Sequence, residues 1–334
     1  MNRRDFLKTA ACAAAGMFLA RGLSGGVTAA FGRDASAAET GGGPPTVFMT
    51  KNITPAGLTA IYGSLDRDLK DRVAVKISTG EPGGHNYLAP ALIGELVRSV
   101  NGTIVDANTA YNGRRANTRD HVQAAREHGF FDIAPVDILD ADGELRLPVR
   151  GGKHLRDVRV GSHFADYGSI LVLSHFKGHA MAGFGGALKN IAIGIASRSG
   201  KCLVHTAGRS ETNPFDGPDT QDEFTESMAE AAEGMIRAMG RENMVYINVM
   251  NNLSIDCDCD SNPARPELPD IGILASRDPV AVDRAGVDLV YAADAARGAA
   301  LRRRIEEKRG THILDHAESL GIGSQRYRLV SIDG

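Results

Sequence analysis

Two histidines and one lysine on a glycine-rich stretch are the residues best suited to chemistry in this sequence. His179, Lys189 and His205 all lie within residues 174–205. Neutral imidazole is a common metal ligand and the usual proton-transfer group near neutral pH. A lysine amine beside it can neutralise an anion or act as a nucleophile. The stretch therefore predicts a site for a metal, a cofactor or a small anionic molecule.

The surroundings of these residues have the layout of a binding site in an α/β protein. The apolar run at residues 170–173 predicts a buried strand, and His175, a further catalytic candidate, follows it with Lys177. A helix start is predicted near residue 187, where free N–H groups would hold an anion. The glycines expected to line a cofactor there are Gly183, Gly185 and Gly186. Alternatively, the histidines are surface turn residues and the glycines only permit close packing.

The cysteines form a second candidate site. Cys257 and Cys259 make a Cys-x-Cys pair between aspartates, and such a pair can supply two thiolates to one metal. Cys202 and His205 would complete a Cys₃His ligand set if the fold brings them together. A disulfide between the paired cysteines, or an exposed acidic loop with incidental thiols, are the alternatives.

An arginine-rich loop is a candidate anion-binding element. Arg114, Arg115 and Arg119 follow a predicted strand. Because a guanidinium group suits carboxylate or phosphate, we expect Arg114 to bind an anionic group of the substrate or cofactor. A solvated basic loop explains the same pattern. Glu81 and His85, after an earlier strand, are candidates for the same cleft or simple turn residues.

The elements that must position these residues alternate between strands and helices. Strands are predicted at residues 72–78, 102–107, 136–139, 158–160, 169–174, 244–249, 271–275 and 327–332. Helices are predicted at residues 88–100, 118–128, 219–239 and 278–292, with Asp278 as N-cap. This alternation predicts an α/β fold of two Rossmann-like lobes, with mostly parallel sheets and a cleft between them. The lobes would be residues 51–150 and 151–334 of a single domain.

The N-terminus resembles an export signal. Residues 2–8, NRRDFLK, match the twin-arginine pattern, and a weakly apolar alanine-rich segment follows. We expect a signal peptide over residues 1–37, a Gly/Pro linker over residues 38–50, passage through the twin-arginine translocase, and a periplasmic or other extracytoplasmic location. An amphipathic N-terminal helix is the alternative. That route often carries proteins folded around a cofactor, which favours a preloaded group.

Composition limits the possible partners. The chain has 334 residues, 43% of them hydrophobic, and a net charge of −3, which gives no electrostatic case for nucleic acid. No apolar run reaches the ~18 residues that span a bilayer, so no stable membrane span is expected after cleavage. A small-molecule substrate is the expected partner.

Several of these motifs resemble an uncharacterised family catalogued as domain of unknown function 362. The resemblance covers most of residues 70–295, and its motifs include YNGR at 111–114, SHFKGH at 174–179, GGALKN at 185–190 and CDC at 257–259. Many relatives carry an added ferredoxin-like module with an iron–sulfur cluster. The Cys-x-x-Cys-x-x-Cys run of that module does not occur in this chain.

More remotely, residues 179–189 with His205 are similar to the lactate racemase family. The resemblance implies that His179 is a proton-transfer base, that Lys189 anchors a nickel-pincer nucleotide and that His205 ligates the nickel. Two departures stand out. Residues 78–81, STGE, replace that family's phosphate-binding motif, and an arginine pair replaces its other catalytic histidine.

Two functions follow as hypotheses. The first is an exported metal- or cofactor-dependent enzyme for a small carboxylate-bearing substrate, with racemase, epimerase or redox chemistry. The second is a non-catalytic metal or iron–sulfur binding or maturation protein, in which the Cys-x-Cys pair matters more than the histidines. The cofactor candidates are accordingly a transition metal, in the nickel-pincer nucleotide by resemblance, or an iron–sulfur cluster.

Overall fold

The centre of the molecule is one eight-stranded sheet. The structure, a computed structural model, describes residues 43–333. The strand order is β12 (Arg328–Ser331), β1 (Thr46–Thr50), β11 (Gly272–Ser276), β10 (Met244–Met250), β7 (Ser169–His175), β2 (Val73–Lys76), β3 (Gly102–Asp106) and β4 (Val136–Ile138). β11 runs antiparallel to both of its neighbours, and the other pairs are parallel. The predicted α/β class with a mostly parallel sheet is confirmed.

The two predicted lobes share this sheet. Strands from residues 51–150 and from residues 151–334 meet where β2 pairs with β7, with Val73 opposite Ser169. The site is therefore built at one edge of a single large sheet, not in a cleft between two sheets.

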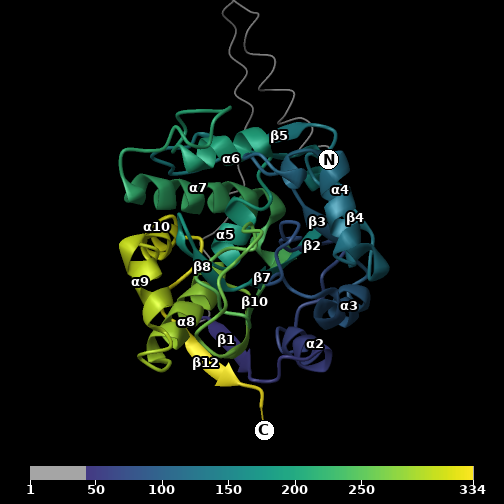
Figure 1. Ribbon diagram of the computed structural model, residues 1–334, viewed down its shortest axis with the longest axis vertical. Coiled ribbons are helices and arrows are strands. Elements are labelled where there is room, and N and C mark those ends of the chain that lie inside the picture. The colour runs from purple at the N-terminus through teal and green to yellow at the C-terminus, as the bar shows by residue number, and fades with distance from the viewer. Residues whose placement is uncertain (1–42, 334) are drawn as a thin grey trace, which may run out of the picture.

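Helices cover both faces of the sheet, as Figure 1 shows. One face carries α2 (Pro55–Gly63), α3 (Pro90–Ser99) and α4 (Thr118–Glu127), and the other carries α5 (Ala187–Ala192), α7 (Gln221–Met239) and α8 (Pro279–Ala292). Along β7, Ile170 and Val172 pack into one core, whereas Leu171 and Leu173 pack into the other. This explains why the strand reads as a continuous apolar run, as strands buried on both faces do.

Shorter elements complete the fold. Two small hairpins pair β5 (Glu144–Pro148) with β6 (Asp157–Gly161), and β8 (Lys177–His179) with β9 (Gly183–Gly185). The remaining helices are α6 (Arg198–His205), α9 (Ala299–Glu307) and α10 (His312–Ser319). The predicted N-cap of α8 is confirmed, because Asp278 Oδ1 accepts hydrogen bonds from the backbone N–H groups of Val280 and Ala281, both at 2.9 Å.

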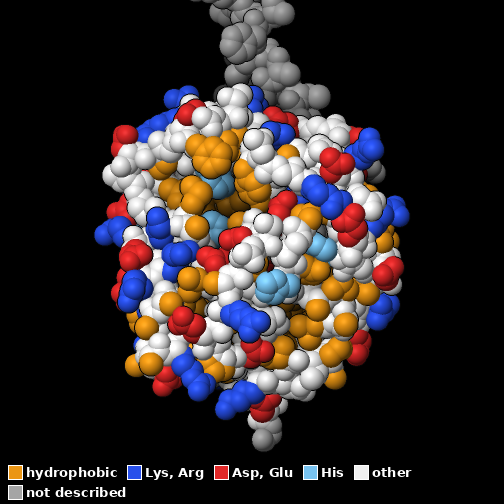
Figure 2. Space-filling model, in the orientation of Figure 1, with side chains coloured by type: hydrophobic (Ala, Val, Ile, Leu, Met, Phe, Trp, Pro, Cys, Tyr) orange, Lys and Arg blue, Asp and Glu red, His pale blue; other side chains and the backbone are white. Residues whose placement is uncertain are grey.

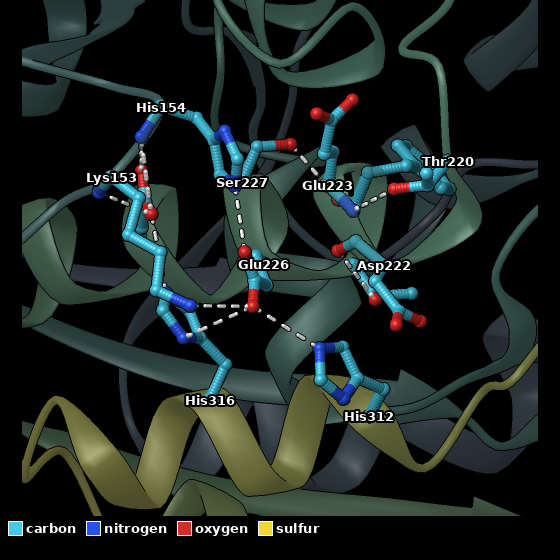
Figure 3. A network of polar contacts seen from close by, with 12 residues as sticks. Lys153, His154, Thr220, Asp222, Glu223, Glu226, Ser227, His312 and His316 are labelled. Carbon is cyan, nitrogen blue, oxygen red and sulfur yellow. Dashed lines mark hydrogen bonds and ion pairs between the residues drawn. The ribbon is translucent and has the colours of Figure 1, made fainter.

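A half-buried carboxylate on α7, Glu226, binds side chains of α10. Figure 3 shows Glu226 facing His312 and His316 of α10 and the loop between β5 and β6 that contains Lys153 and His154. Its oxygens lie 2.7 Å from His154 Nε2, 3.2 Å from His312 Nε2 and 2.8 Å from Lys153 Nζ. His316 lies between Glu226 and Glu230, the next carboxylate of α7, so polar contacts as well as apolar packing join α10 to α7.

The N-terminal predictions are only partly covered. The expected signal peptide, residues 1–37, lies outside the described residues. The end of the expected linker is corrected: residues 46–50 form β1, which pairs with β11 and β12. Among the described helices, none combines the length and apolarity needed to cross a membrane.

Candidate functional site

A pocket opens where four parallel strands end. β3, β2, β7 and β10 point the same way, so their carboxyl ends meet at one edge of the sheet. The cavity has a volume of about 340 Å³. Figure 2 shows a hollow on the face it views, with hydrophobic side chains around the rim and histidine inside. The ionisable residues lining the pocket are Lys76, Asp106, Tyr111, Arg115, His175, Lys177, His179, Lys189, Lys201, His205, Cys257 and Cys259.

The β8–β9 hairpin brings His179 to this pocket. Its turn uses the positive φ of Gly183, 80°, a conformation that favours glycine. On the outer strand of the hairpin, a Cβ added at Gly178 would lie 2.4 Å from the carbonyl oxygen of Ile255. The loop at residues 251–271, which we call the cysteine loop, can therefore lie directly against the hairpin backbone.

The predicted glycines have different positions. Gly185 and Gly186 line the pocket. Gly183 instead packs against the turn before α10, where an added Cβ would lie 2.9 Å from the Cα atom of Gly310. Its role is the turn and this close packing rather than direct contact with a pocket ligand.

The start of α5 does not offer an anion site, contrary to the expectation from sequence. Asp283 accepts hydrogen bonds from the backbone N–H groups of Ala187 at 2.7 Å and Leu188 at 2.9 Å. A Cβ at Gly186 would lie 2.3 Å from the Asp283 carboxylate. Burial raises the pKa of Asp283 to about 6, although these N–H donors favour its charged form. The carboxylate occupies the helix terminus that an external anion would need.

His205 is oriented as a metal ligand would be. Its Nδ1–H donates to the carbonyl oxygen of Lys201 at 2.7 Å, which fixes the ring and leaves the Nε2 lone pair available. Metal-binding histidines commonly donate their second N–H to such an acceptor. Burial lowers the pKa of His205 to about 4, so the ring is neutral at pH 7.

His179 is held in the opposite tautomer. Its Nδ1 accepts hydrogen bonds from the backbone N–H groups of Met181 at 3.2 Å and Ala182 at 3.0 Å. The proton of the neutral ring therefore sits on Nε2. Burial lowers the pKa of His179, and the nearby charge of Lys189 lowers it further. This side chain is suited to proton transfer through Nε2.

Cys257 and Cys259 are joined by a hydrogen bond between their side chains. A hydrogen bond from Cys259 holds the pKa of Cys257 well below its ordinary value against the effect of burial, and Lys189 adds to this. The same hydrogen bond and burial raise the pKa of Cys259. Both residues are free cysteines. Cys257 is therefore a nucleophilic or metal-binding thiolate inside the pocket.

His175 and Lys177 anchor the cysteine loop instead of projecting a free group. Asp258 accepts from His175 Nδ1 at 2.7 Å and from Lys177 Nζ at 2.8 Å. The other ring nitrogen of His175 lies 2.7 Å from the carbonyl oxygen of Asn251. Burial opposes the charge of Asp258, but Lys177 and His175 lower its pKa to about 2. This triad holds Cys257 and Cys259 over the pocket, and His175 has no ring nitrogen left for catalysis.

The arginine prediction is corrected by one position. Arg114 makes a two-point salt bridge with Glu127 on the surface, at 2.6 and 2.8 Å, and its side chain is 43% exposed. Arg115 is buried and lines the pocket, where its Nε donates to Glu81 at 2.8 Å. Sequence alone gives no means to choose between adjacent arginines in a loop.

A buried charge cluster at the ends of β2 and β3 was missed from the sequence. Lys76 Nζ lies 3.1 Å from Asp106 Oδ1, and Asp106 also accepts from the backbone and hydroxyl of Thr79, each at 3.0 Å. Burial opposes its charge, but Lys76 and then His121 hold the pKa of Asp106 well below its ordinary value. The sequence signal for this cluster was that two apolar strands, β2 and β3, each end in a charged residue.

Cys202 is not part of the site. It lies buried on α6, and the ligand-bearing group that the described residues bring together consists of His179, Cys257 and Cys259. The expected Cys₃His set is therefore not assembled, although His205 lines the same pocket.

The lactate racemase apoprotein from Thermoanaerobacterium thermosaccharolyticum is similar in structure, with 15% identity and a TM-score of 0.43, over 74% of this chain and 57% of that one. A structural-genomics target from Thermotoga maritima gives 12% identity and a TM-score of 0.39, over 79% and 58%. The chain thus spans somewhat more than half the length of each.

The sequence has no significant match among curated proteins. The sequence profile of the family described as "Domain of unknown function (DUF362)" matches residues 73–288. This segment contains the strands, the hairpin and the cysteine loop that build the pocket. The chain belongs to this family.

Proposed function

We propose that this protein is a metal- or cofactor-dependent enzyme that acts on a small carboxylate-bearing substrate in the pocket. One observation carries the proposal: His179, Lys189 and His205 line the same cavity. The pocket thus combines a proton-transfer group, an amine and a histidine with an available lone pair. Such convergence of ionisable groups is typical of active sites.

The two histidines have different roles, which follow from their tautomers. His205, with Nδ1–H fixed on a carbonyl, is the metal ligand through Nε2. His179, whose Nδ1 accepts from two backbone N–H groups, gives or takes a proton at Nε2. A base close to the substrate and a metal beside it can together remove hydrogen from a carbon next to a carboxylate.

The resemblance to lactate racemases supports a nickel-pincer nucleotide as the cofactor. Lys189 and His205 line the pocket and fit the roles of anchor and ligand. When bound, such a cofactor exchanges a hydride with a 2-hydroxy acid. The Thr79 hydroxyl lies within the segment where that family binds phosphate, and it is engaged with Asp106 and His121. A nucleotide phosphate would therefore be held by other groups in this chain.

Intact mass and elemental analysis of the protein from cells that make it naturally test this proposal. We expect a mass adduct on Lys189 together with a stoichiometric metal, both lost in Lys189→Met. The matched control is Lys51→Met, an exposed lysine outside the pocket. A bare polypeptide mass without metal, in a correctly folded wild-type protein, would contradict the proposal.

A metal or iron–sulfur binding protein is the second candidate. His179, Cys257 and Cys259 present ligand atoms within 4.8 Å of one another, which suits one metal with an open position. Binding through His179 Nε2 would displace its proton, since Nδ1 already accepts two hydrogen bonds. This cost places the cluster second to His205 as a metal site.

Cysteine and lysine variants separate the two candidates. A metal carrier loses its metal in Cys257→Ser and keeps it in Lys189→Met. The proposed enzyme loses its cofactor in Lys189→Met and in His205→Gln. Both variants should also fail to convert single-enantiomer 2-hydroxy acids, a reaction that chiral chromatography measures.

Export through the twin-arginine route is part of the proposal and rests on the NRRDFLK segment. Replacing both Arg3 and Arg4 with lysine should retain the protein in the cytoplasm when cells are fractionated. Unchanged export of that variant would argue against the route while leaving the enzymatic proposal intact.

A further inference from the structure

Lys201 is a buried cation at the pocket that has no carboxylate within ion-pair distance, although Asp140 and Asp106 act on it from further away. It lies on α6, is 6% exposed and lines the cavity. Its Nζ donates to the carbonyl oxygens of Ala196 at 2.6 Å and Ala107 at 3.4 Å. Within residues 43–333, Nζ makes no ion pair with a carboxylate. An ammonium group carries three N–H donors, so one remains for a ligand.

The other cations lining the pocket differ from Lys201 in this respect. Each has an anion nearby: Lys76 has Asp106 at 3.1 Å, Arg115 has Glu81 at 2.8 Å, Lys177 has Asp258 at 2.8 Å, and Lys189 has the Cys257 sulfur at 4.0 Å. Among these five cations, Lys201 is the one whose neighbouring anions, Asp140 and Asp106, act on it without forming an ion pair.

Burial makes the charge of Lys201 costly. Loss of hydration lowers the pKa of Lys201 to about 8, Asp140 and Asp106 raise it, and Lys76 and Arg115 lower it further. A bound monoanion would stabilise the ammonium form. A dianion would leave excess negative charge in the same enclosed space, which is unfavourable where water is excluded.

The position of Lys201 suits a short ligand. Lys201 and His205 are four residues apart on α6, so they lie one turn apart on the same face of the helix. Both line the cavity. An anion held at Lys201 would place the next atoms of the same molecule beside the free Nε2 of His205.

We propose that Lys201 binds the carboxylate of the substrate and selects short monocarboxylates over dicarboxylates and phosphate. This inference rests on the proposed function for the carboxylate-bearing substrate class and adds the residue and the preference. Arg114, the sequence-based candidate for this role, lies outside the pocket, paired with Glu127.

Calorimetric titration of the full chain with propionate, succinate and inorganic phosphate tests the inference. At pH 7 we expect wild-type protein to bind propionate more tightly than it binds succinate or phosphate. Lys201→Met should weaken propionate binding about tenfold or more, the value of one charge-assisted contact. Lys51→Met, the exposed-lysine control, should bind as wild type does.

A pH series on the wild type provides a second measurement that does not depend on a variant folding. Because the anion needs protonated Lys201, propionate affinity should fall as the pH rises above about 8. Unchanged affinity in a folded Lys201→Met variant, absent propionate binding, tighter binding of succinate or phosphate, or a flat affinity between pH 7 and 9 would each overturn the inference.

The experiments distinguish failure of the Lys201 inference from failure of the proposed function. Propionate binding through Lys201 in protein that carries no metal or adduct would support the inference and count against the cofactor. A loaded cofactor with propionate affinity unaffected by Lys201→Met would do the reverse.

Discussion

The Nζ atom of Lys189 lies 4.0 Å from the sulfur of Cys257. This contact joins the lysine of the glycine-rich stretch to the cysteine loop, which follows β10 much later in the chain. It also gives the thiolate of Cys257 a cationic neighbour, which helps to hold its pKa low.

Replacing Lys189 with methionine should make Cys257 less reactive. Loss of a positive charge at this distance should raise the pKa of Cys257. Alkylation by iodoacetamide at pH 7, followed for the Cys257 peptide by mass spectrometry, should slow accordingly. Lys51→Met should leave the rate unchanged, and an equal rate in Lys189→Met would show that the lysine does not act on the thiolate.

The stability of the protein should depend on His205 below neutral pH. The pKa of His205 is about 4 in the folded state and about 6.5 when unfolded, so unfolding takes up a proton between these values. Its contribution is complete above pH 6.5 and is lost as pH falls toward 4. In urea titrations, His205→Gln should show a shallower loss over this window, by about 1–3 kcal/mol. His85→Gln, an exposed histidine, serves as the control.

The Glu226 cluster should govern resistance to stronger acid. Burial opposes its charge, but Lys153, His154 and then His312 lower the pKa of Glu226 to about 2. A depressed carboxylate stabilises the fold above its unfolded pKa of about 4.5, and this support is lost as pH falls from 4.5 to 2. Glu226→Gln should lower the unfolding free energy at pH 7 by about 1–3 kcal/mol.

The matched control for that variant is Glu95→Gln, an exposed glutamate on α3. Both variants should be followed by urea unfolding at pH 7 and pH 3. If Glu226→Gln loses as much stability between these pH values as the wild type does, the cluster is not the acid-sensitive element.

Gly178→Ala should displace the cysteine loop. A Cβ there would sit 2.4 Å from the carbonyl oxygen of Ile255, a backbone atom that cannot simply rotate away. We expect a stability loss of about 1–3 kcal/mol and slower alkylation of Cys257 at neutral pH. Gly217→Ala, where nothing lies within 4 Å, should change neither quantity. Wild-type behaviour of Gly178→Ala would mean that the loop is not positioned by this contact.

The sequence predicted the elements of the sheet better than their assembly. Residues 169–174 and 244–249 were recognisable as strands because they are apolar throughout, and both are central in the sheet. Strand β1 was missed because residues 46–50 directly follow a Gly/Pro-rich stretch. The pairing of β2 with β7, which merges the two expected lobes, depends on contacts distant in sequence that no local pattern encodes.

The candidate site was predicted in part. His179, Lys189 and His205 were identified by residue type and spacing, and they do line one pocket. The hydrogen-bond partners that give the rings of His179 and His205 different tautomers are backbone groups, so residue types could not reveal them. Cys202 was grouped with the other cysteines by composition, whereas its position on α6 keeps it out of the ligand cluster. The candidate role of Lys201 emerges only from the structure, where its side chain lines the pocket without a carboxylate at ion-pair distance.

The pairing of β1 with β12 sets an order of assembly. Thr46 lies opposite Arg328, and their side chains are hydrogen-bonded at 3.0 Å across 282 positions of chain. During synthesis β1 is made early but stays unpaired on that side until the last strand has emerged from the ribosome. A chain cut short before residue 328 would expose Val47 and Phe48 on an open sheet edge, a surface prone to association. Strand β12 covers this edge and places Arg328 and Ser331 on the new outer strand. Chains that contain β12 therefore show a polar edge strand where shorter chains would show apolar β1.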